Sequence, residues 1–377
     1  MKKKILLISV NDRSYSSYRY FADRLAEALE QAGCQIGWCH VASGDGESGK
    51  AWQAALSEAV SFCPDAVIDF NSILPKMVVG GRCLPELFEA PFYHYVLDHP
   101  LYHKKALEAK IPDYRCICVD REHEVYIKSN YPHITSAFTH PLPGSVGKNA
   151  SKPFSERKNR VLFTGTYENP AKYMELMKGL PQTQKKECME LAQQLLDGTV
   201  RSMEGAVTPE NAGYLFLADA YVRHYRRERC IKEFIRAGTT LDIYGNGWSE
   251  MTMSGLRGAD LQIYPSVMYS DYVNIIGDYR VALNIMPGFV WGSHDRITCA
   301  MRNGTAVLTD ENPYVRDQYL ASGSAVAFSW GCPERMGALA EQMLTDSAET
   351  ERIAHRGRNY ADRHHSWESL AERILQK

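Results

Sequence analysis

The sequence lacks several features that mark whole classes of protein. It contains no uninterrupted apolar run long enough to cross a bilayer, and its ten cysteines include no CxxC pair. Its 43 lysines and arginines against 45 aspartates and glutamates give a formal charge of -2, whereas a dedicated nucleic-acid binder needs a strongly basic face. We therefore expect no transmembrane segment and no nucleic-acid partner, while peripheral contact with a membrane stays open.

The N-terminus resembles a secretory signal only superficially. Three lysines precede a short apolar stretch, residues 5–10, but the polar residues that follow contain no small-residue cleavage site. A buried first strand and a cytoplasmic location are the better interpretation. The scattered cysteines are then expected to stay reduced and to act as small core residues.

The length of 377 residues and a hydrophobic content of 45% predict two domains, because one compact core rarely grows this large. Short apolar runs alternate with amphipathic helical patterns in both halves of the chain, which indicates parallel sheets covered by helices on both faces. We predict an α/β fold with two Rossmann-like doubly wound domains facing a cleft. The predicted strands are residues 4–10, 35–41, 65–70, 92–97 and 114–119 in the first half, and 160–166, 241–244, 261–264, 281–286, 306–309 and 326–329 in the second.

The domain boundary is predicted from residues 141–159, where Pro, Gly, Ser and Lys leave almost nothing to bury. This gives an N-terminal domain over 1–145 and a C-terminal domain over 156–365, with a helical insertion over 171–237. Residues 366–377 are expected to form a helix that packs back towards the N-terminal domain. Within the insertion, the basic cluster from Arg223 to Arg229 is expected to be a solvated helix face.

The most informative segment is residues 281–310. A buried strand ends at Met286, a glycine-containing loop leads to Ser293 and His294, and a helix then begins near Arg296. Free N–H groups at a helix start, with an arginine beside them, suit a diphosphate. An arginine that only caps local structure explains the pattern equally well.

This segment resembles the C-terminal domain of glycosyltransferases with the GT-B fold, in particular the spore-maturation (CgeB-like) group. Arg296, Gly304, Leu308, Thr309 and Asp310 match the group's pattern. LDIYGNGW (241–248), RVLFTGT (160–166) and HHSW (364–367) resemble its other motifs, over roughly residues 160–377. In the first half the resemblance is weaker and rests on YHYVLDHPLYH (93–103).

The resemblance implies a hexosyltransferase-type enzyme that moves a sugar from a nucleotide-diphosphate donor, with a UDP-sugar favoured, to an unidentified protein or glycan acceptor. It implies no metal and no further cofactor. The C-terminal domain would bind the donor, and the N-terminal domain the acceptor. The donor site it implies comprises Gly165, Thr166, Tyr244, Gly245, Trp248, Ser293, His294, Arg296, Thr309 and Asp310.

One position departs from the family pattern. Donor-binding domains of this kind usually place a ribose-binding glutamate five residues before the helix-ending glycine, where this sequence has Cys299. A thiol cannot accept two charge-assisted hydrogen bonds as a carboxylate does, so Glu311 or Asp295 would have to take that role. The departure favours an alternative function, a non-catalytic nucleotide-sugar-binding partner subunit. A nucleotide-sugar epimerase is a further alternative.

Two N-terminal segments are candidates for the acceptor side. The loop after the first strand offers Asn11, Asp12, Arg13 and Tyr15, although an ordinary capped loop explains it as well. Asp98 and His99 follow a predicted strand, where either could act as the general base or polarise the donor sugar. Three nearby histidines lack the regular spacing of a zinc site, and any one of them has an ordinary structural explanation.

Overall fold

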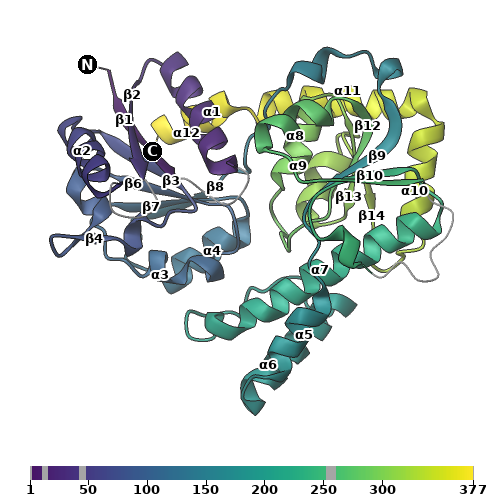
Figure 1. The fold of residues 1–377 in the computed structure, drawn as a ribbon, viewed down its shortest axis with the longest axis horizontal. Coiled ribbons are helices and arrows are strands. Elements are labelled where there is room, and N and C mark those ends of the chain that lie inside the picture. The colour runs from purple at the N-terminus through teal and green to yellow at the C-terminus, as the bar shows by residue number, and fades with distance from the viewer. Residues whose placement is uncertain (1, 11–15, 42–47, 252–259, 377) are drawn as a thin grey trace. The chain divides into compact units, whose positions relative to one another are not determined.

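The computed structural model describes residues 2–10, 16–41, 48–251 and 260–376. The chain forms two compact units, which are drawn in Figure 1. The N-terminal unit comprises Met1–Leu142 with Ser366–Lys377, and the C-terminal unit comprises Pro143–His365. The acceptor-side candidates Asn11, Asp12, Arg13 and Tyr15 lie outside the described residues.

The N-terminal unit is built on a six-stranded sheet in the order β2-β1-β3-β6-β7-β8, in which every neighbouring pair is parallel. The central strands are mostly apolar and are buried on both faces, as a parallel sheet between helices requires. The strands are β1 (Lys4–Val10), β2 (Gln35–Val41), β3 (Ala66–Phe70), β6 (Phe92–Val96), β7 (Tyr114–Cys118) and β8 (Ser136–Thr139), with a short hairpin of β4 (Val78–Val79) and β5 (Arg82–Cys83).

Helices from both ends of the chain cover this sheet. Phe21 packs against Phe70 of β3 and against Trp367 of the last helix, with ring centroids 5.9 and 6.1 Å apart. The C-terminal helix therefore belongs to the core of the N-terminal unit. The helices are α1 (Ser17–Gln31), α2 (Ser48–Ser61), α3 (Lys104–Leu107), α4 (Arg121–Asn130) and α12 (Trp367–Leu375).

The C-terminal unit has a second six-stranded parallel sheet, in the order β11-β10-β9-β12-β13-β14. The direction in which strands are added reverses between β9 and β12, and open α/β sheets bind ligands at such a switch point, beyond the carboxyl ends of the strands. The strands are β9 (Lys158–Thr164), β10 (Leu241–Tyr244), β11 (Leu261–Tyr264), β12 (Tyr279–Leu283), β13 (Ala306–Asp310) and β14 (Val326–Phe328).

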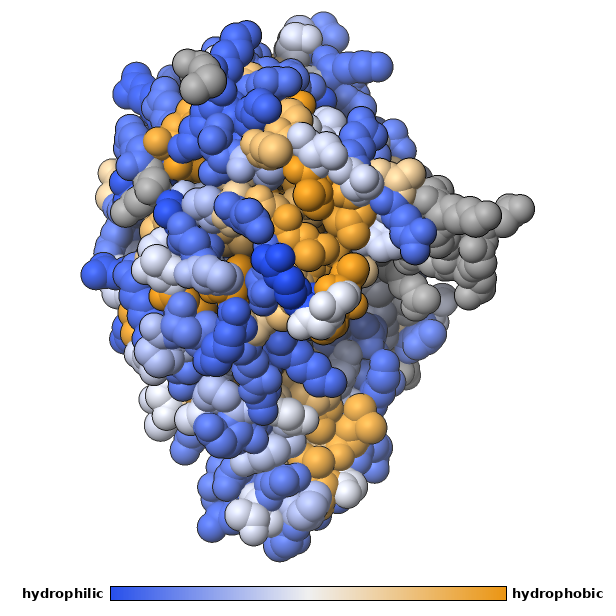
Figure 2. All heavy atoms as spheres, turned by 90° about the vertical axis from the view of Figure 1, so that its left-hand side faces the viewer, coloured by the Kyte–Doolittle hydropathy of each residue, from blue (hydrophilic) through white to orange (hydrophobic). Residues whose placement is uncertain are grey.

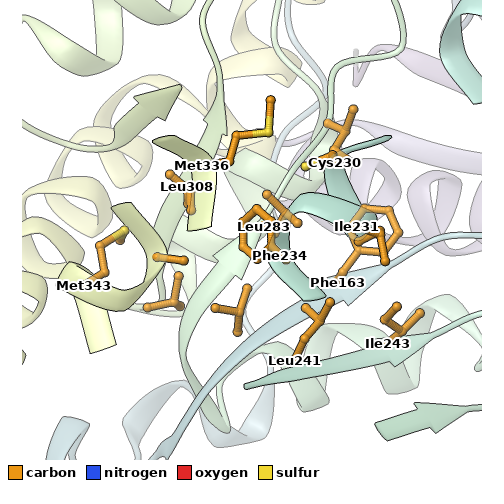
Figure 3. Packing of buried hydrophobic residues seen from close by; sticks show 14 of the residues in the cluster. Phe163, Cys230, Ile231, Phe234, Leu241, Ile243, Leu283, Leu308, Met336 and Met343 are labelled. Atoms are coloured by element: carbon orange, nitrogen blue, oxygen red, sulfur yellow. The ribbon is translucent and has the colours of Figure 1, made fainter. Parts of the chain in front are cut away.

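Alternate residues of these strands serve two apolar layers. Figure 3 shows Phe163, Leu241, Leu283 and Leu308 packed against side chains of α7 and α10, among them Phe234 and Met336. The neighbouring strand residues Leu162, Ala282 and Val307 meet α8 and α9 on the opposite face. This two-sided covering confirms the predicted doubly wound architecture. The remaining helices of the unit are α8 (Tyr269–Ile276), α9 (Asp295–Arg302), α10 (Arg335–Thr345) and α11 (Ser347–His364).

Three helices are inserted between β9 and β10, as the sequence predicts: α5 (Pro170–Lys178), α6 (Gln182–Asp197) and α7 (Ala212–Arg236). In Figure 1, α5, α6 and the first part of α7 extend away from the sheet. The last part of α7 returns to it, where Ile231 and Phe234 are fully buried in the core. The insertion is therefore anchored to the strands that carry the predicted donor site.

The segment 141–159, which the sequence suggests is a free linker, instead belongs to the C-terminal unit from Pro143 onwards. A Cβ on Gly144 would lie 2.3 Å from the carbonyl oxygen of Thr298, so glycine is needed for this close contact. Arg157 is buried and donates to the carbonyl oxygens of Asn303 (2.9 Å) and Gly304 (2.7 Å). The small residues that suggested a linker instead allow the segment to lie tightly on the C-terminal unit.

The cysteines behave as the sequence predicts: all ten are free, and seven of them are buried. Among the described residues, no helix has the length and apolar character needed to cross a membrane. Figure 2 shows a largely hydrophilic face on which apolar side chains gather in the centre and near the lower edge.

Candidate functional site: an arginine pair at a strand switch point

The carboxyl end of β9 forms a tight turn at Gly165, which two neighbouring features hold in place. The indole N–H of Trp248 donates to the carbonyl oxygen of Gly165 at 2.8 Å, and a Cβ on Gly245 would lie 2.1 Å from that same oxygen. Trp248 is buried, so it supports the turn and offers no face to a ligand. The GNGW motif thus shapes this end of the sheet through close backbone packing.

Arg296 lies beside this turn. Its Nη2 would be 3.5 Å from a Cβ at position 165, which places the guanidinium directly over the glycine. Arg296 is the second residue of α9, the helix that follows the long loop after β12. Across the described ranges, its side chain has no hydrogen bond or ion pair with another residue. A partly buried cation at a helix start, with no hydrogen bond to a carboxylate among the described residues, is suited to an anionic ligand.

Arg227 of α7 reaches the same place from the helical insertion. Its Nη1 donates to the carbonyl oxygen of Thr166, and its Nε is buried without a hydrogen-bond partner among the described residues. Burial, together with the positive charges of Arg296 and Arg223, lowers the pKa of Arg227 to about 9. Two arginines that repel each other at a glycine turn form a site that a diphosphate would stabilise.

The expectation that residues 223–229 form a solvated helix face is therefore wrong. The described side chains of this segment are at most partly exposed, and Arg226 and Arg227 both donate to backbone carbonyl oxygens. A charged run on a helix predicts solvent exposure only if that face is not covered. In this protein the rest of the domain covers it.

His294 and Asp295 support the start of α9. Nδ1 of His294 lies 2.8 Å from Oδ1 of Asp295, and the hydroxyl of Tyr269 donates to Oδ2 at 2.9 Å. Burial alone would raise the pKa of Asp295, but His294, Arg296 and Tyr269 together hold it well below its usual value. Burial lowers the pKa of His294. Asp295 thus stays ionised, with its oxygens already engaged, and it is a poor substitute for a ribose-binding carboxylate.

Three other donor-site candidates, Ser293, Thr309 and Asp310, are buried and have structural roles. Ser293 accepts a hydrogen bond from the hydroxyl of Tyr319 at 2.7 Å, and Thr309 accepts one from Asn284 at 2.9 Å. Asp310 accepts from the backbone N–H of Met286 and from the indole of Trp330. These contacts hold the loop after β12 in place, and the structure does not bring these three side chains to the arginine pair.

Cys299 is fully buried on α9, and its thiol lies 3.7 Å from the carbonyl oxygen of Ser145. Burial raises the pKa of this thiol to about 12, so it is neutral. Cys299 is therefore a packing residue at the position where related domains usually have the ribose-binding glutamate. Glu311, the other proposed substitute, is exposed and lines a separate cavity beyond β13.

Tyr244 lies at the carboxyl end of β10, next to the Gly165 turn. Its ring stacks on that of Tyr264 at the end of β11, with centroids 4.6 Å apart, and both rings are partly exposed. The pair forms an aromatic surface at the ends of β10 and β11, on the β9 side of the switch point. The sequence analysis named Tyr244 as a donor-site residue but did not predict this contact.

In the N-terminal unit, Asp98 and His99 follow β6. Asn71, which follows β3, donates from its side-chain amide to Asp98 (2.8 Å) and accepts from the backbone N–H of Leu97 (2.8 Å). Nδ1 of His99 accepts from the backbone N–H of Leu101 at 3.1 Å, which assigns the proton of a neutral ring to Nε2. Both side chains are partly exposed. Asn71 was missed, although an asparagine directly after a buried strand is a recognisable signal.

The nearby histidines are packing residues. His94 is fully buried, accepts from the backbone N–H of Ser72 through Nε2, and lies 2.9 Å from the hydroxyl of Tyr114 through Nδ1. Burial lowers the pKa values of His94, His103 and His123. In the parts of the chain that are described, no group of three metal-ligating side chains comes together.

Comparisons with known proteins bear on this geometry. Residues 226–376 match the family model described as glycosyl transferase-like. An alpha-glucosyltransferase in complex with UDP matches 100% of this chain over 100% of its own, with a TM-score of 0.60 at 11% identity. The GT-B fold accounts for such a match over both units. The chain has the GT-B fold.

Two further GT-B neighbours match at similar levels. A glycosyltransferase from Rickettsia africae gives a TM-score of 0.55 at 10% identity, over 100% of this chain and 97% of its own. A sucrose-phosphate synthase from Thermosynechococcus elongatus gives 0.53 at 12% identity, over 100% and 98%. No curated protein matches the chain. The matched family segment includes Arg227 and Arg296, so the arginine pair lies within the glycosyl transferase-like part of this GT-B chain.

Proposed function

We propose that this protein is a glycosyltransferase that uses a nucleotide-diphosphate sugar as donor. The observation that carries the proposal is the meeting of Arg296 and Arg227 at the Gly165 turn, at the switch point of a parallel sheet. Arg227 is held there by its hydrogen bond to the carbonyl oxygen of Thr166, and Arg296 lies there as part of the first turn of α9. A diphosphate between them would receive hydrogen bonds from two planar guanidinium groups and from the start of α9.

The same arrangement supports catalysis without a metal ion. When the glycosidic bond to the donor breaks, negative charge grows on the departing diphosphate. Fixed positive groups aimed at that charge stabilise the transition state more than the ground state, which is the condition for rate acceleration. We propose that Arg296 and Arg227 take the part that a divalent cation plays in metal-dependent transferases.

A UDP-sugar with a hexose is the donor we favour. The pair of Tyr244 and Tyr264 offers an aromatic surface for a base beside the diphosphate position. Structural neighbours include proteins solved with UDP and with UDP-glucose. The motif pattern further favours the CgeB-like group, and the composition a cytoplasmic enzyme.

Asp98 is the better candidate for the general base. A base must have a free lone pair, and the neutral His99 ring already uses its acceptor nitrogen on Leu101. The hydrogen bond from Asn71 orients one carboxylate oxygen of Asp98, and within the described ranges the other oxygen accepts no hydrogen bond. We propose that Asp98 accepts the proton of the acceptor hydroxyl, while His99 is positioned to donate.

Cys299 favours a second candidate, a non-catalytic partner subunit that binds nucleotide sugars. A buried neutral thiol cannot hold a ribose as the usual glutamate does. Incubating the purified protein with UDP-glucose separates the two candidates. A transferase should release UDP slowly even with water as acceptor, whereas a pure binder should release none.

The donor site itself is tested by calorimetric titration with UDP in the presence of EDTA. We expect metal-free binding in the wild type, weaker binding in Arg296→Lys because the bidentate geometry is lost, and weaker binding still in Arg296→Ala. The unliganded stability of these variants should hardly change, because the guanidinium makes no hydrogen bond to another described residue, and its attraction to Asp295 and its repulsion of Arg227 have opposite effects. A large loss of stability with normal UDP affinity would make Arg296 a structural residue.

A further inference from the structure

A separate cavity of about 370 Å³ lies within the C-terminal unit, beyond the carboxyl ends of β12, β13 and β14. Met286, Asp310 and Trp330 line it from the sheet, and the end of α6 with Arg226 of α7 lines it from the helical insertion. Its volume is within the roughly 300–1,000 Å³ of small-molecule sites. The proposed donor site uses none of these side chains.

The floor of the cavity is fixed by interlocking contacts. Asp310 is buried, and its Oδ2 accepts from the indole N–H of Trp330 at 3.0 Å. The guanidinium of Arg226 lies 5.5 Å from the centre of the Trp330 ring and donates to the carbonyl oxygen of Leu195 at 2.6 Å. The tryptophan is thereby held between a carboxylate and a cation. A partly exposed aromatic ring in a fixed orientation is a suitable surface for the C–H face of a sugar.

The charges around the cavity indicate a neutral ligand. Three arginines and three carboxylates line it, so the formal charges cancel: Arg201, Arg226 and Arg316 against Asp197, Asp310 and Glu311. This differs from the Gly165 turn, where two arginines meet. A sugar hydroxyl both donates and accepts, so it can bond to a carboxylate and to a guanidinium at once. A ligand of high charge would be repelled by half of this lining.

The helical insertion serves both places through neighbouring residues. Arg226 borders the cavity and Arg227 reaches the Gly165 turn. Successive residues on an α-helix point in directions about 100° apart, which explains how one helix can supply both. We propose that this cavity binds a neutral sugar residue of a glycan, distinct from the sugar of the donor. Its role as an acceptor site rests on the proposed transferase function, whereas the binding itself does not.

The test uses the full chain and methyl glycosides of glucose, galactose, mannose and N-acetylglucosamine as probes. Saturation-transfer NMR in the presence of saturating UDP should show that at least one of them binds. Glu311→Gln and Arg201→Gln should each weaken that binding about tenfold or more, which corresponds to about 1.4 kcal/mol. Glu341→Gln and Arg335→Gln are matched controls, because both residues are exposed on the same unit and do not line the cavity.

The outcomes separate this inference from the proposed function. The cavity assignment is overturned if UDP binds and no glycoside does. It is also overturned if Glu311→Gln and Arg201→Gln leave glycoside binding unchanged. Neither outcome affects the proposed transferase function. Competition by UDP-glucose but not by UDP would show that the cavity holds the donor's own sugar, which also overturns the cavity assignment. If the protein binds a glycoside but no nucleotide, the sugar-binding assignment of the cavity is supported and the proposed transferase function is overturned.

Discussion

Replacing Arg227 by glutamine should weaken nucleotide binding without destabilising the unliganded protein. The charged form of Arg227 is unfavourable in the folded chain, because burial and two neighbouring arginines lower its pKa to about 9. Against an ordinary value of 12.5, this shift corresponds to about 5 kcal/mol. The substitution removes that cost.

The substitution also removes the hydrogen bond to the carbonyl oxygen of Thr166. A bond from a charged donor contributes about 1.5–3 kcal/mol. The expected net effect on the unliganded protein is a gain of about 2–3.5 kcal/mol in the free energy of unfolding, measured by urea denaturation. Arg236→Gln is the matched control, since Arg236 lies on the same helix and, among the residues that the structure describes, its side chain forms only an exposed ion pair with Glu233.

Nucleotide binding should change in the opposite direction. If Arg227 donates to the diphosphate, its loss should weaken UDP binding by about 1.5–3 kcal/mol, which is roughly 10- to 150-fold in Kd. Calorimetry measures this directly. Lower stability together with unchanged UDP affinity would refute the reasoning, because Arg227 would then be a structural residue that holds the loop at Thr166.

Three other substitutions test separate parts of the structure. Asp98→Asn should reduce UDP release from UDP-glucose by about 10²- to 10⁴-fold while UDP affinity stays the same, and His99→Gln should keep most of the activity; equal losses in both would contradict the assignment of the base. Gly245→Ala should lower both the melting temperature and UDP affinity, because its methyl group would lie 2.1 Å from the Gly165 carbonyl oxygen; a normal melting temperature would show that the turn can move. Asp69→Asn tests the effect of burial on a carboxyl group. Burial raises the pKa of Asp69 to about 7 despite hydrogen bonds from Ser72 and Phe70. The folded state therefore holds this proton between about pH 4 and 7, and the stability of the wild type falls as pH rises through that window. Relative to wild type, the variant should therefore gain about 3 kcal/mol between pH 5 and pH 8 in urea denaturation, and a constant difference would show that Asp69 ionises normally.

The fold was predictable because its signal is local. The strands at 241–244 and 261–264 have the predicted bounds, and α9 begins within one residue of the predicted position. Short apolar runs bounded by Gly, Pro and polar residues indicate buried strands of a parallel sheet. β8 was missed, since its four residues, Ser136–Thr139, are too few and too polar to show a pattern.

The site was only partly predictable, because side-chain direction depends on tertiary packing. Arg296 and Gly165 are brought together as expected, whereas Ser293, Thr309 and Asp310 are turned into the interior by Tyr319, Asn284 and Met286. Two other basic residues of the C-terminal unit, Arg280 and Lys172, are engaged elsewhere. Arg280 donates to the carbonyl oxygens of Phe154 and Ser155, and Lys172 forms an exposed pair with Glu168.

Arg227 escaped sequence reasoning because a run of arginines on a helix looks like a solvent-exposed face. A signal was nevertheless present: Asp219, Arg223 and Arg227 are spaced by four residues and share one side of α7. Asp219 pairs with Arg223, at 3.1 Å, and that spacing leaves Arg227 one turn further along without an acidic partner at the same interval. An arginine that a helix carries towards a strand switch point, with no carboxylate four residues before or after it on that helix, is a candidate anion ligand, and the helical insertion supplies it in this chain.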